Sequence, residues 1–314
     1  MEIKNIKRYS INSRKSKVGI SSFAKPYKKG NSFRDFIGAL PDILSGTDIR
    51  NAASSIAIAR KNGNPVILGM GAHPIKLGLS PIIIDLINRG IITTVATNGA
   101  CIVHDFELAY AGFTSEDVAE SLCDGSFGMA YETGSLINTA ITNGVKKGLG
   151  IGSSMGEFIS NDKDMKHIDM SIFGTCYTKK IPVTVHVAIG TDIIHMHPEA
   201  DGASIGVGSL RDFHLLSSIV SGLDGGVFIN LGSAVIIPEV FLKALSLARN
   251  LEQKAKNFTT INMDFIRQYR AVENVLNRPT MDHGKRLGKA INLTGHHEIM
   301  LPLLSAMIIE EMGF

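Results

Sequence analysis

The sequence predicts an α/β protein built on a doubly wound, mostly parallel sheet with helices on both faces and a helical N-terminal extension. Short runs rich in Val and Ile alternate with amphipathic segments along the chain, which is typical of parallel strands buried on both faces. Glycine is also frequent, at 32 of 314 residues, and such an excess suits tight turns between strands and helices.

Two helices are expected before the first strand. Apolar residues recur at helical spacing over residues 32–44 and 47–63. For the second helix, Thr47 or Asp48 is the expected N-cap, because short polar side chains accept hydrogen bonds from the free N–H groups of a first turn. Gly63 is the expected C-terminal stop.

A β-α-β unit follows, and a helical, Gly-punctuated stretch at 130–158 separates it from a second group of alternating elements. The unit comprises a strand at 65–70, a helix at 79–90 with Pro81 in its first turn, and a strand at 91–97. The expected elements of the second group are a helix at 171–180, a strand at 181–189, a helix at 210–223, a strand at 225–231, a helix at 238–255, a strand at 258–263 and a last helix near the C-terminus.

The first thirty residues differ from the rest in charge. They hold nine Lys or Arg and a single acid, Glu2, and removing them from the 32 basic and 29 acidic residues of the chain leaves 23 against 28. We therefore expect a basic arm at 1–30 and a single domain at 31–314, which no linker-like composition interrupts. A transit peptide and a nucleic-acid-binding tail are alternatives. An arm that packs on a neighbouring subunit is favoured, because the segment lacks both a clean amphipathic face and interleaved aromatic residues.

Composition also bears on location and partners. The three cysteines, Cys101, Cys123 and Cys176, have no CxxC spacing, so neither a disulfide framework nor a zinc knuckle is indicated and a cytoplasmic location is expected. No apolar run approaches the roughly 20 residues that a membrane span needs. The acidic body offers no basic groove for nucleic acid.

The ends of the expected strands are where a ligand is expected, because helix N-termini and glycine-lined turns gather at that edge of a doubly wound sheet. The fingerprint GxGxxG is absent, since Gly69-Met70-Gly71 is followed by Pro74 at the place of the third glycine. No Gly-Lys pair is followed by Ser or Thr, so a Walker A loop is absent as well.

A metal site is an alternative at residues 189–202, IGTDIIHMHPEADG, which hold two histidines and three carboxylates. Neither HExxH nor a second HxH pair occurs elsewhere in the chain. The candidate ligands are His195, His197 and Asp201, completed by His104-Asp105 or by His296-His297-Glu298. The other interpretation of that last triplet is the start of a helix, with Glu298 near the positive end of its dipole.

A nucleophile is hard to identify from the sequence. No serine lies in a GxSxG elbow, and buried structural cysteine is the expectation for each thiol. Lys285, in RPTMDHGKRLGK, lies beside Arg286 and follows a glycine, conditions that can lower the pKa of an amine or let a substrate approach closely. The alternative is a lysine in a basic loop.

From about Gly69 to the C-terminus, the strand ends resemble those of deoxyhypusine synthase and its homologues. The motifs of that family are a glycine-started Ser/Asn loop, Thr-Thr-Ala-Gly-Gly, Thr-Asp-Gly, a triple glycine, Asn-Thr-Ala, Trp-Gly-Lys and Phe-Pro-Leu-Leu. They correspond here to GMGAHPIKLGL, ATNGA, GTDI, LGSAV, INMD, HGK and MLPLL. Order and spacing agree, and Arg278-Pro279 precedes the lysine at a slightly shorter interval than in the family.

The resemblance implies a Rossmann-like fold, NAD bound across the subunits of a homotetramer, and chemistry on an amine. In the family, NAD takes a hydride from the carbon beside an amine of spermidine, and a lysine captures the imine before the aminobutyl group passes to a protein lysine. By position, Lys285 would carry the imine. The residues that would contact NAD are Gly71, Thr97, Asn98, Gly99, Asp192, Gly232, Ser233, Asn262 and His296.

Several positions depart from the family. His197 replaces an acid that holds the polyamine, Pro238 an amine-binding histidine, His283 the tryptophan before the lysine, and His296 an acid near the last helix. Because a cationic polyamine is best held by carboxylates, we expect neither spermidine nor a translation factor as substrate. His195 and His197 are instead expected to line the substrate pocket, where they would either bind an anionic or less basic substrate or perform general acid–base catalysis.

The sequence thus predicts a deoxyhypusine synthase-like transferase that uses NAD to oxidise an amine to an imine, with or without aminoalkyl transfer through Lys285. No metal is expected under this interpretation. One alternative is a metal-dependent hydrolase or lyase that uses His195, His197 and His296. The other is a non-catalytic NAD-binding assembly protein.

Overall fold

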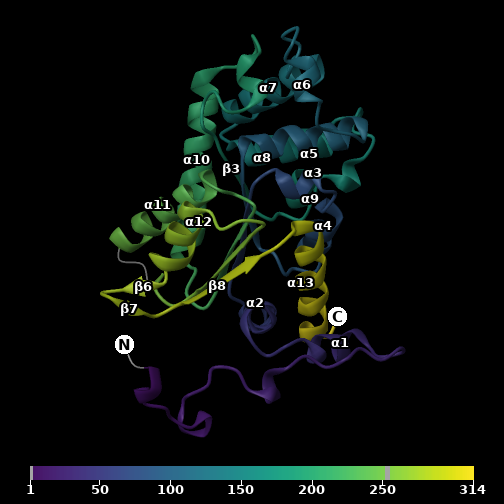
Figure 1. Ribbon diagram of the computed structural model, residues 1–314. Helices are drawn as coiled ribbons and strands as arrows, with labels where there is room; N and C mark the ends of the chain where they lie inside the picture. The colour runs from purple at the N-terminus through teal and green to yellow at the C-terminus, as the bar shows by residue number, and fades with distance from the viewer. Residues whose placement is uncertain (1–2, 252–254) are drawn as a thin grey trace.

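The computed structural model (Figure 1) describes residues 3–251 and 255–314. They hold a six-stranded parallel sheet in the order β3-β2-β1-β4-β5-β8. The strands are β1 (Val66–Met70), β2 (Thr94–Asn98), β3 (Val183–His186), β4 (Val227–Leu231), β5 (Thr259–Asp264) and β8 (Lys289–Thr294). In register, Leu68 pairs with Val95 on one side and with Ile229 on the other. The predicted doubly wound, parallel α/β fold is confirmed.

Helices cover both faces of the sheet. Val66, Leu68 and Met70 of β1 point into the larger core, which packs against helices α2, α4, α5, α8, α9 and α13, whereas Ile67 points into a smaller core beneath α10 and α11. This alternation explains why the central strands are continuous apolar runs. The longer helices are α1 (Phe33–Ala39), α2 (Leu44–Lys61), α4 (Ser80–Asn88), α5 (Gly99–Ala111), α7 (Tyr131–Lys146), α8 (Ile151–Asn161), α9 (Ile172–Thr178), α10 (Gly202–Ser221), α11 (Ile236–Asn250) and α13 (His297–Met312).

Short helical turns connect these elements. They are η1 (Ile3–Asn5), η2 (Ile11–Ser13), η3 (Ile20–Ser22), α3 (His73–Lys76), α6 (Val118–Ser121), η4 (Ile168–Met170), η5 (Ile193–Met196), α12 (Tyr269–Ala271) and the π-helical η6 (Val272–Asn277). The helix predicted at 238–255 corresponds to α11, and residues 252–254 of that prediction lie outside the described residues.

The predicted N-cap of the second helix is wrong. Helix α2 begins at Leu44, so Thr47 and Asp48 lie inside its first turns. The Thr47 hydroxyl donates to Asp42 Oδ1 at 3.1 Å, and Arg50 donates to the same oxygen at 2.9 Å. Asp42 therefore organises the start of this helix from outside it.

Strand β8 and the hairpin before it are not among the elements expected from the sequence. Strand β8 lies at the edge of the sheet, and its alternating polar residues, such as Asn292, leave no continuous apolar run. A short antiparallel hairpin, β6 (Met281–Asp282) and β7 (Lys285–Arg286), precedes it.

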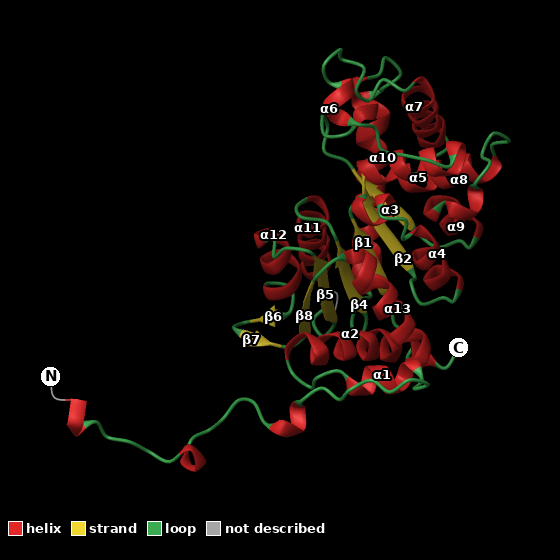
Figure 2. Ribbon diagram, turned by 45° about the vertical axis from the view of Figure 1, so that its right-hand side comes forward, coloured by secondary structure: helices red, strands yellow, loops and turns green. Residues whose placement is uncertain are grey.

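The N-terminal segment runs away from the helices and the sheet as a mostly extended chain (Figure 2). Its first backbone hydrogen bonds to the body come from Asp42 N–H to the Ser22 carbonyl and from Lys25 N–H to the Ala39 carbonyl. The predicted boundary at residue 30 stays a prediction. None of the helices in residues 3–251 and 255–314 combines the length and the apolar character that a membrane span requires.

Candidate functional site

The strand order reverses between β1 and β4, and the carboxyl ends of these two strands form the floor of the candidate site. Gly71, after β1, donates its N–H to the Leu231 carbonyl at 3.1 Å. A Cβ at Gly71 would lie 2.7 Å from the Gly232 carbonyl oxygen, so the two glycine turns touch backbone to backbone. A doubly wound sheet binds dinucleotides at such a reversal, because bare backbone lets the ligand approach closely.

Asp192 lies beside this floor, against the first residue of α5. A Cβ at Gly99 would lie 2.0 Å from Asp192 Oδ2, so only glycine leaves room for the carboxylate. Asp192 is 9% exposed, and its Oδ2 has no hydrogen-bond partner among the described residues. Burial raises the pKa of Asp192, and His195 and Thr191 oppose the shift.

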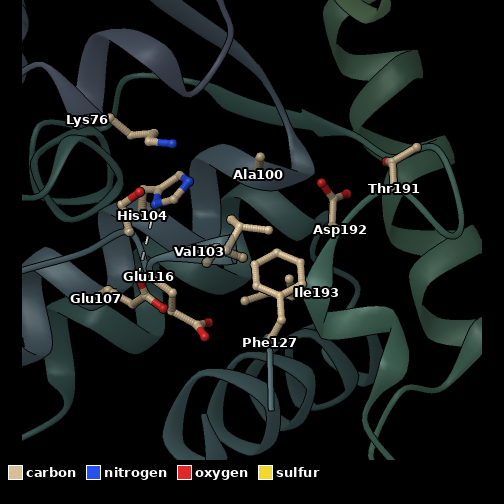
Figure 3. A pocket seen from close by; sticks show the side chains of 12 residues that line it. Lys76, Ala100, Val103, His104, Glu107, Glu116, Phe127, Thr191, Asp192 and Ile193 are labelled. Atoms are coloured by element: carbon tan, nitrogen blue, oxygen red, sulfur yellow. Dashed lines mark ion pairs between the residues drawn. The ribbon is translucent and has the colours of Figure 1, made fainter. Parts of the chain in front are cut away.

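A pocket of about 150 Å³ opens between the N-terminal half of α5 and the loop that carries Asp192. Figure 3 shows Asp192 and Thr191 on one side, Lys76, His104 and the two glutamates on the other, and Phe127 with Ile193 at the base. The residues that line it are Lys76, Ala100, Val103, His104, Glu107, Ser115, Glu116, Val118, Phe127, Thr191, Asp192 and Ile193.

Hydrogen bonds hold the acidic side of this pocket in place. Glu107 accepts from the hydroxyls of Thr114 and of Thr133, the latter at 2.9 Å. His104 Nδ1 lies 2.7 Å from the Thr114 hydroxyl, which links the imidazole to the carboxylate. Burial lowers the pKa of His104 against the opposing effect of Glu107, so the ring stays neutral near pH 7.

A second pocket, of about 420 Å³, adjoins the first and shares Glu107 and Glu116 with it. Glu132 adds a third glutamate to its wall, and Tyr110 and Phe113 add aromatic surface. Glu116 accepts from the Gly128 N–H at 3.1 Å. The combined space therefore offers carboxylates, a neutral imidazole and apolar walls, a set that suits a cationic amine with an aliphatic body.

Most of the residues predicted to contact NAD lie together, whereas the residues predicted to be catalytic lie elsewhere. Gly71, Asn98, Gly99, Asp192, Gly232 and Ser233 lie at the carboxyl edge of the sheet. Thr97 lies one residue before the end of β2 and Asn262 lies within β5, and both are 1% exposed. The Thr97 hydroxyl donates to the Thr184 carbonyl at 3.1 Å, and the Asn262 amide joins Asn230 to Asn292 across three strands.

The two predicted pocket histidines are used elsewhere. His195 Nδ1 accepts from the Gly190 N–H at 3.1 Å and so shapes the loop before Asp192. The His197 ring packs on Gly134 of α7, where a Cβ would lie 2.0 Å from Nδ1, and its Nε2 is 2.8 Å from the Gly128 carbonyl. Neither ring lines the pocket beside Asp192.

Lys285 and His296 lie apart from that pocket. Lys285 is exposed on β7, before the start of β8, and therefore at the amino edge of the sheet, whereas the glycine turns and Asp192 are at the carboxyl edge. His296 does not line the pocket either, but it follows β8 at the carboxyl edge of the sheet, where it is the exposed residue that precedes α13, with Nδ1 3.7 Å from Glu298.

The metal alternative receives no support from the geometry. Residues 3–251 and 255–314 contain no group of three or more His, Cys, Asp or Glu side chains that could hold a metal ion. His195 and His197 each have a separate hydrogen-bond partner, and His296 is exposed at the start of α13.

Of the residues that line the pocket opposite Asp192, the sequence indicates His104 alone, and only as a candidate metal ligand. Ala100, Val103, His104 and Glu107 follow helical spacing from the end of β2, so they share one face of α5. That spacing could have indicated from the sequence that these four side chains face the same pocket. Glu116 and Phe127 come from the long connection after α5, where no periodicity indicates which side chains turn inward.

No protein-family model matches the sequence, and no curated protein matches it significantly. Among solved structures, the chain is similar to a putative deoxyhypusine synthase from Entamoeba histolytica, with a TM-score of 0.52 and 12% identity, covering 90% of this chain and 96% of that one. It is also similar to a conserved putative LOR/SDH protein from Methanococcus maripaludis S2, with a TM-score of 0.51 and 19% identity, covering 86% of this chain and 71% of that one.

A third similar structure is AgrE in a ternary complex with ornithine and NAD⁺, with a TM-score of 0.53 and 13% identity. The alignment covers 85% of this chain, which spans about a third of the AgrE chain. It spans a similar share of ArgZ, an arginine dihydrolase from cyanobacteria. At these identities the likeness is one of fold, and it confirms the Rossmann-like, deoxyhypusine synthase-like fold expected from the sequence.

Proposed function

We propose that this protein is an NAD-dependent enzyme that oxidises an amine-bearing small molecule to an imine. Asp192 carries the proposal: it is a buried carboxylate with an unpartnered Oδ2 among the described residues, and it lies where the wall of an acidic pocket meets the N-terminus of α5. A buried acceptor without a donor costs about 1–3 kcal/mol. A ribose hydroxyl of a bound dinucleotide would satisfy it.

The carboxyl edge of the sheet fits NAD. Gly71 and Gly232 form a floor without side chains, and Gly99 leaves the start of α5 open beside Asp192. Ser233 and Asn98 add polar groups at the same edge. Bound NAD supplies a hydride acceptor. The complex of AgrE with NAD⁺ and ornithine supports this assignment through the shared fold.

The acidic pocket suits the amine. Glu107 and Glu116 lie opposite Asp192 across a narrow space, and these carboxylates attract an ammonium group. They come from positions other than the family's polyamine-binding acids, so the histidine replacements do not remove the capacity to hold a cation. Lys76 at the rim would hold a carboxylate of the same substrate.

Oxidation removes a hydride from the carbon beside the nitrogen and a proton from the nitrogen, and leaves a C=N bond. His104 is the proposed acceptor of that proton, because burial keeps its imidazole neutral and Glu107, with Nδ1 4.0 Å from Oε2, stabilises the imidazolium that forms. Phe127 and Ile193 at the base of the pocket exclude water from the imine.

Oxidation without group transfer is the favoured form of the reaction, since Lys285 lies at the amino edge of the sheet. Transfer through Lys285 would need the hairpin of a neighbouring copy. A homotetramer and a cytoplasmic location remain part of the proposal, and they rest on the resemblance and on cysteine usage.

The test is NADH formation with NAD and a panel of diamines, polyamines and basic amino acids. We expect turnover with at least one of them, and a loss of about tenfold or more in kcat/KM in Glu107→Gln, because a charge-assisted hydrogen bond disappears. Glu199→Gln, an exposed substitution in the loop after His197, is the matched control and should have no effect. No turnover with any amine, or equal loss in both variants, would contradict the proposal.

Borohydride reduction during turnover, followed by mass analysis, tests the transfer step separately. A substrate adduct on Lys285 would show that this lysine captures the imine, as aminoalkyl transfer requires. Turnover without such an adduct would indicate that the enzyme oxidises the amine without transferring a group.

A further inference from the structure

His297 is a buried side chain for which the proposed function has no role. It is the first residue of α13 and is 1% exposed. Its ring lies against Gly232, where a Cβ would come within 2.8 Å of Cε1 and where φ is +65°. His297 therefore lies directly behind the turn after β4, at the reversal of strand order.

The hydrogen bonds of the ring define its tautomer. Nε2 lies 3.2 Å from the Met263 carbonyl oxygen, and a carbonyl only accepts, so Nε2 carries the hydrogen. In the neutral ring Nδ1 is then an acceptor. Burial lowers the pKa of His297, and the nearby His73 lowers it further. The Met263 carbonyl, Asp264 and Glu298 act in the opposite direction and only partly offset the shift. The ring is thus neutral near pH 7.

Nδ1 of His297 is buried and has no hydrogen-bond partner in the part of the chain that the structure describes. Natural proteins satisfy most buried acceptors, because an unmet one costs about 1–3 kcal/mol. An unmet acceptor at a ligand-binding edge indicates a donor that comes from outside the chain.

Two exposed rings lie against His297. The His73 ring, at the start of α3, is 5.4 Å from it between centroids, and the Phe265 ring, after β5, is 6.4 Å away, both edge-on. His73 and Phe265 also contact each other at 5.9 Å. Among the described residues the His73 side chain has ring contacts but no hydrogen bond, so it can move aside at little cost.

We propose that His297 Nδ1 accepts a hydrogen bond from a ribose hydroxyl of the bound dinucleotide once the rings of His73 and Phe265 move aside. This inference rests on the proposed function, since it takes NAD as the ligand. A phosphate group has no hydrogen to donate near neutral pH and would be repelled by the lone pair. A hydroxyl or a substrate ammonium can donate, and the position of His297 at the reversal of strand order favours the dinucleotide.

Two substitutions separate ligand binding from structure. In His297→Gln, the amide N–H can still reach the Met263 carbonyl, but the acceptor at the position of Nδ1 is lost. In His297→Asn, the amide oxygen takes the position of Nδ1, but the bond to Met263 is lost. If His297 had only a structural role, His297→Asn would still lose stability, but His297→Gln would bind NAD as tightly as the wild type.

The experiment is calorimetric titration of NAD alone into the wild type and both variants, with melting temperatures measured alongside. His297→Gln should keep its melting temperature and bind NAD about tenfold more weakly, the value of one hydrogen bond. His297→Asn should melt at a lower temperature and keep most of the affinity. Wild-type affinity in His297→Gln overturns the inference and leaves the proposed function intact, whereas no binding by the wild type overturns both.

If neither variant folds, proton NMR of the histidine rings in the wild type gives the answer. The His73 signals should shift on addition of NAD while those of His214, exposed on α10, stay unchanged. Unchanged His73 signals at saturating NAD would overturn the inference. A shift that needs an amine as well as NAD would assign the donor to the substrate and also overturn it.

Discussion

Substitution of Gly99 by alanine tests how the proposed nucleotide site is built. The added Cβ would lie 2.0 Å from Asp192 Oδ2 and 2.7 Å from its Cγ, far inside van der Waals contact. Gly99 is held within α5, so the carboxylate on the loop must move. The substitution therefore displaces Asp192 while its charge is retained.

Two opposing effects decide the free energy of unfolding of Gly99→Ala. Alanine is favoured over glycine by about 1 kcal/mol in a helix interior and by less at a first residue such as Gly99. Overpacking a buried contact costs about 1–3 kcal/mol. We therefore expect a net loss of about 1 kcal/mol, small enough for the protein to stay folded.

The effect of Gly99→Ala on the affinity for NAD should be larger than its effect on stability. A hydrogen bond to a charged carboxylate contributes about 1.5–3 kcal/mol, so displacing Asp192 should raise the dissociation constant about 10- to 100-fold. Calorimetric titration and urea denaturation measure the two quantities. Gly206→Ala is the control: it lies in α10, and a Cβ there meets no described atom of another element within 4 Å. That variant should gain about 1 kcal/mol and bind NAD normally. Wild-type NAD affinity in Gly99→Ala would refute the role given to Asp192.

Three further predictions concern other parts of the molecule. Burial raises the pKa of Asp212 to about 7, so its stabilising contribution is complete below about pH 4 and is lost as the pH rises through 7. In Asp212→Asn the free energy of unfolding should therefore fall less between about pH 4 and 7 than in the wild type. Urea denaturation measures it, and the same pH dependence in both proteins would contradict the prediction. Lys285→Met should leave NAD affinity and NADH formation unchanged, because Lys285 is exposed at the amino edge, and a strong loss would mean that a neighbouring copy completes the site. Gly71→Ala should weaken NAD binding more than it lowers stability, since its Cβ would lie 2.7 Å from the Gly232 carbonyl oxygen. An unchanged NAD affinity would show that the turns at Gly71 and Gly232 are not part of the nucleotide site.

The fold was largely predictable because its central strands are buried on both faces. Continuous runs such as the one at 65–70 can only be accommodated in a covered parallel sheet. The edge strand β8 was not predictable in the same way, because one side of it is exposed and its pattern is mixed. The start of α2 depends on Asp42, which contacts Thr47 and Arg50 from outside the helix, so local capping rules gave the wrong residue.

The candidate site was only partly predictable. The glycines and Asp192 follow strands directly, so the register of the sheet brings them to one edge. The resemblance suggested that His195 and His197 share the substrate pocket, but the His197 ring fills the space left by Gly134 on another helix. Glu116 enters the pocket from a long connection, and only the tertiary structure places it opposite Asp192.

The most direct test of the central claim is calorimetric titration of NAD into metal-stripped wild-type protein and into Asp192→Asn. The account predicts saturable binding of one NAD per chain, weakened about tenfold or more in the variant, because the neutral amide replaces a charged acceptor of the ribose hydroxyl. No binding by the wild type, or equal affinities in the two proteins, would contradict it.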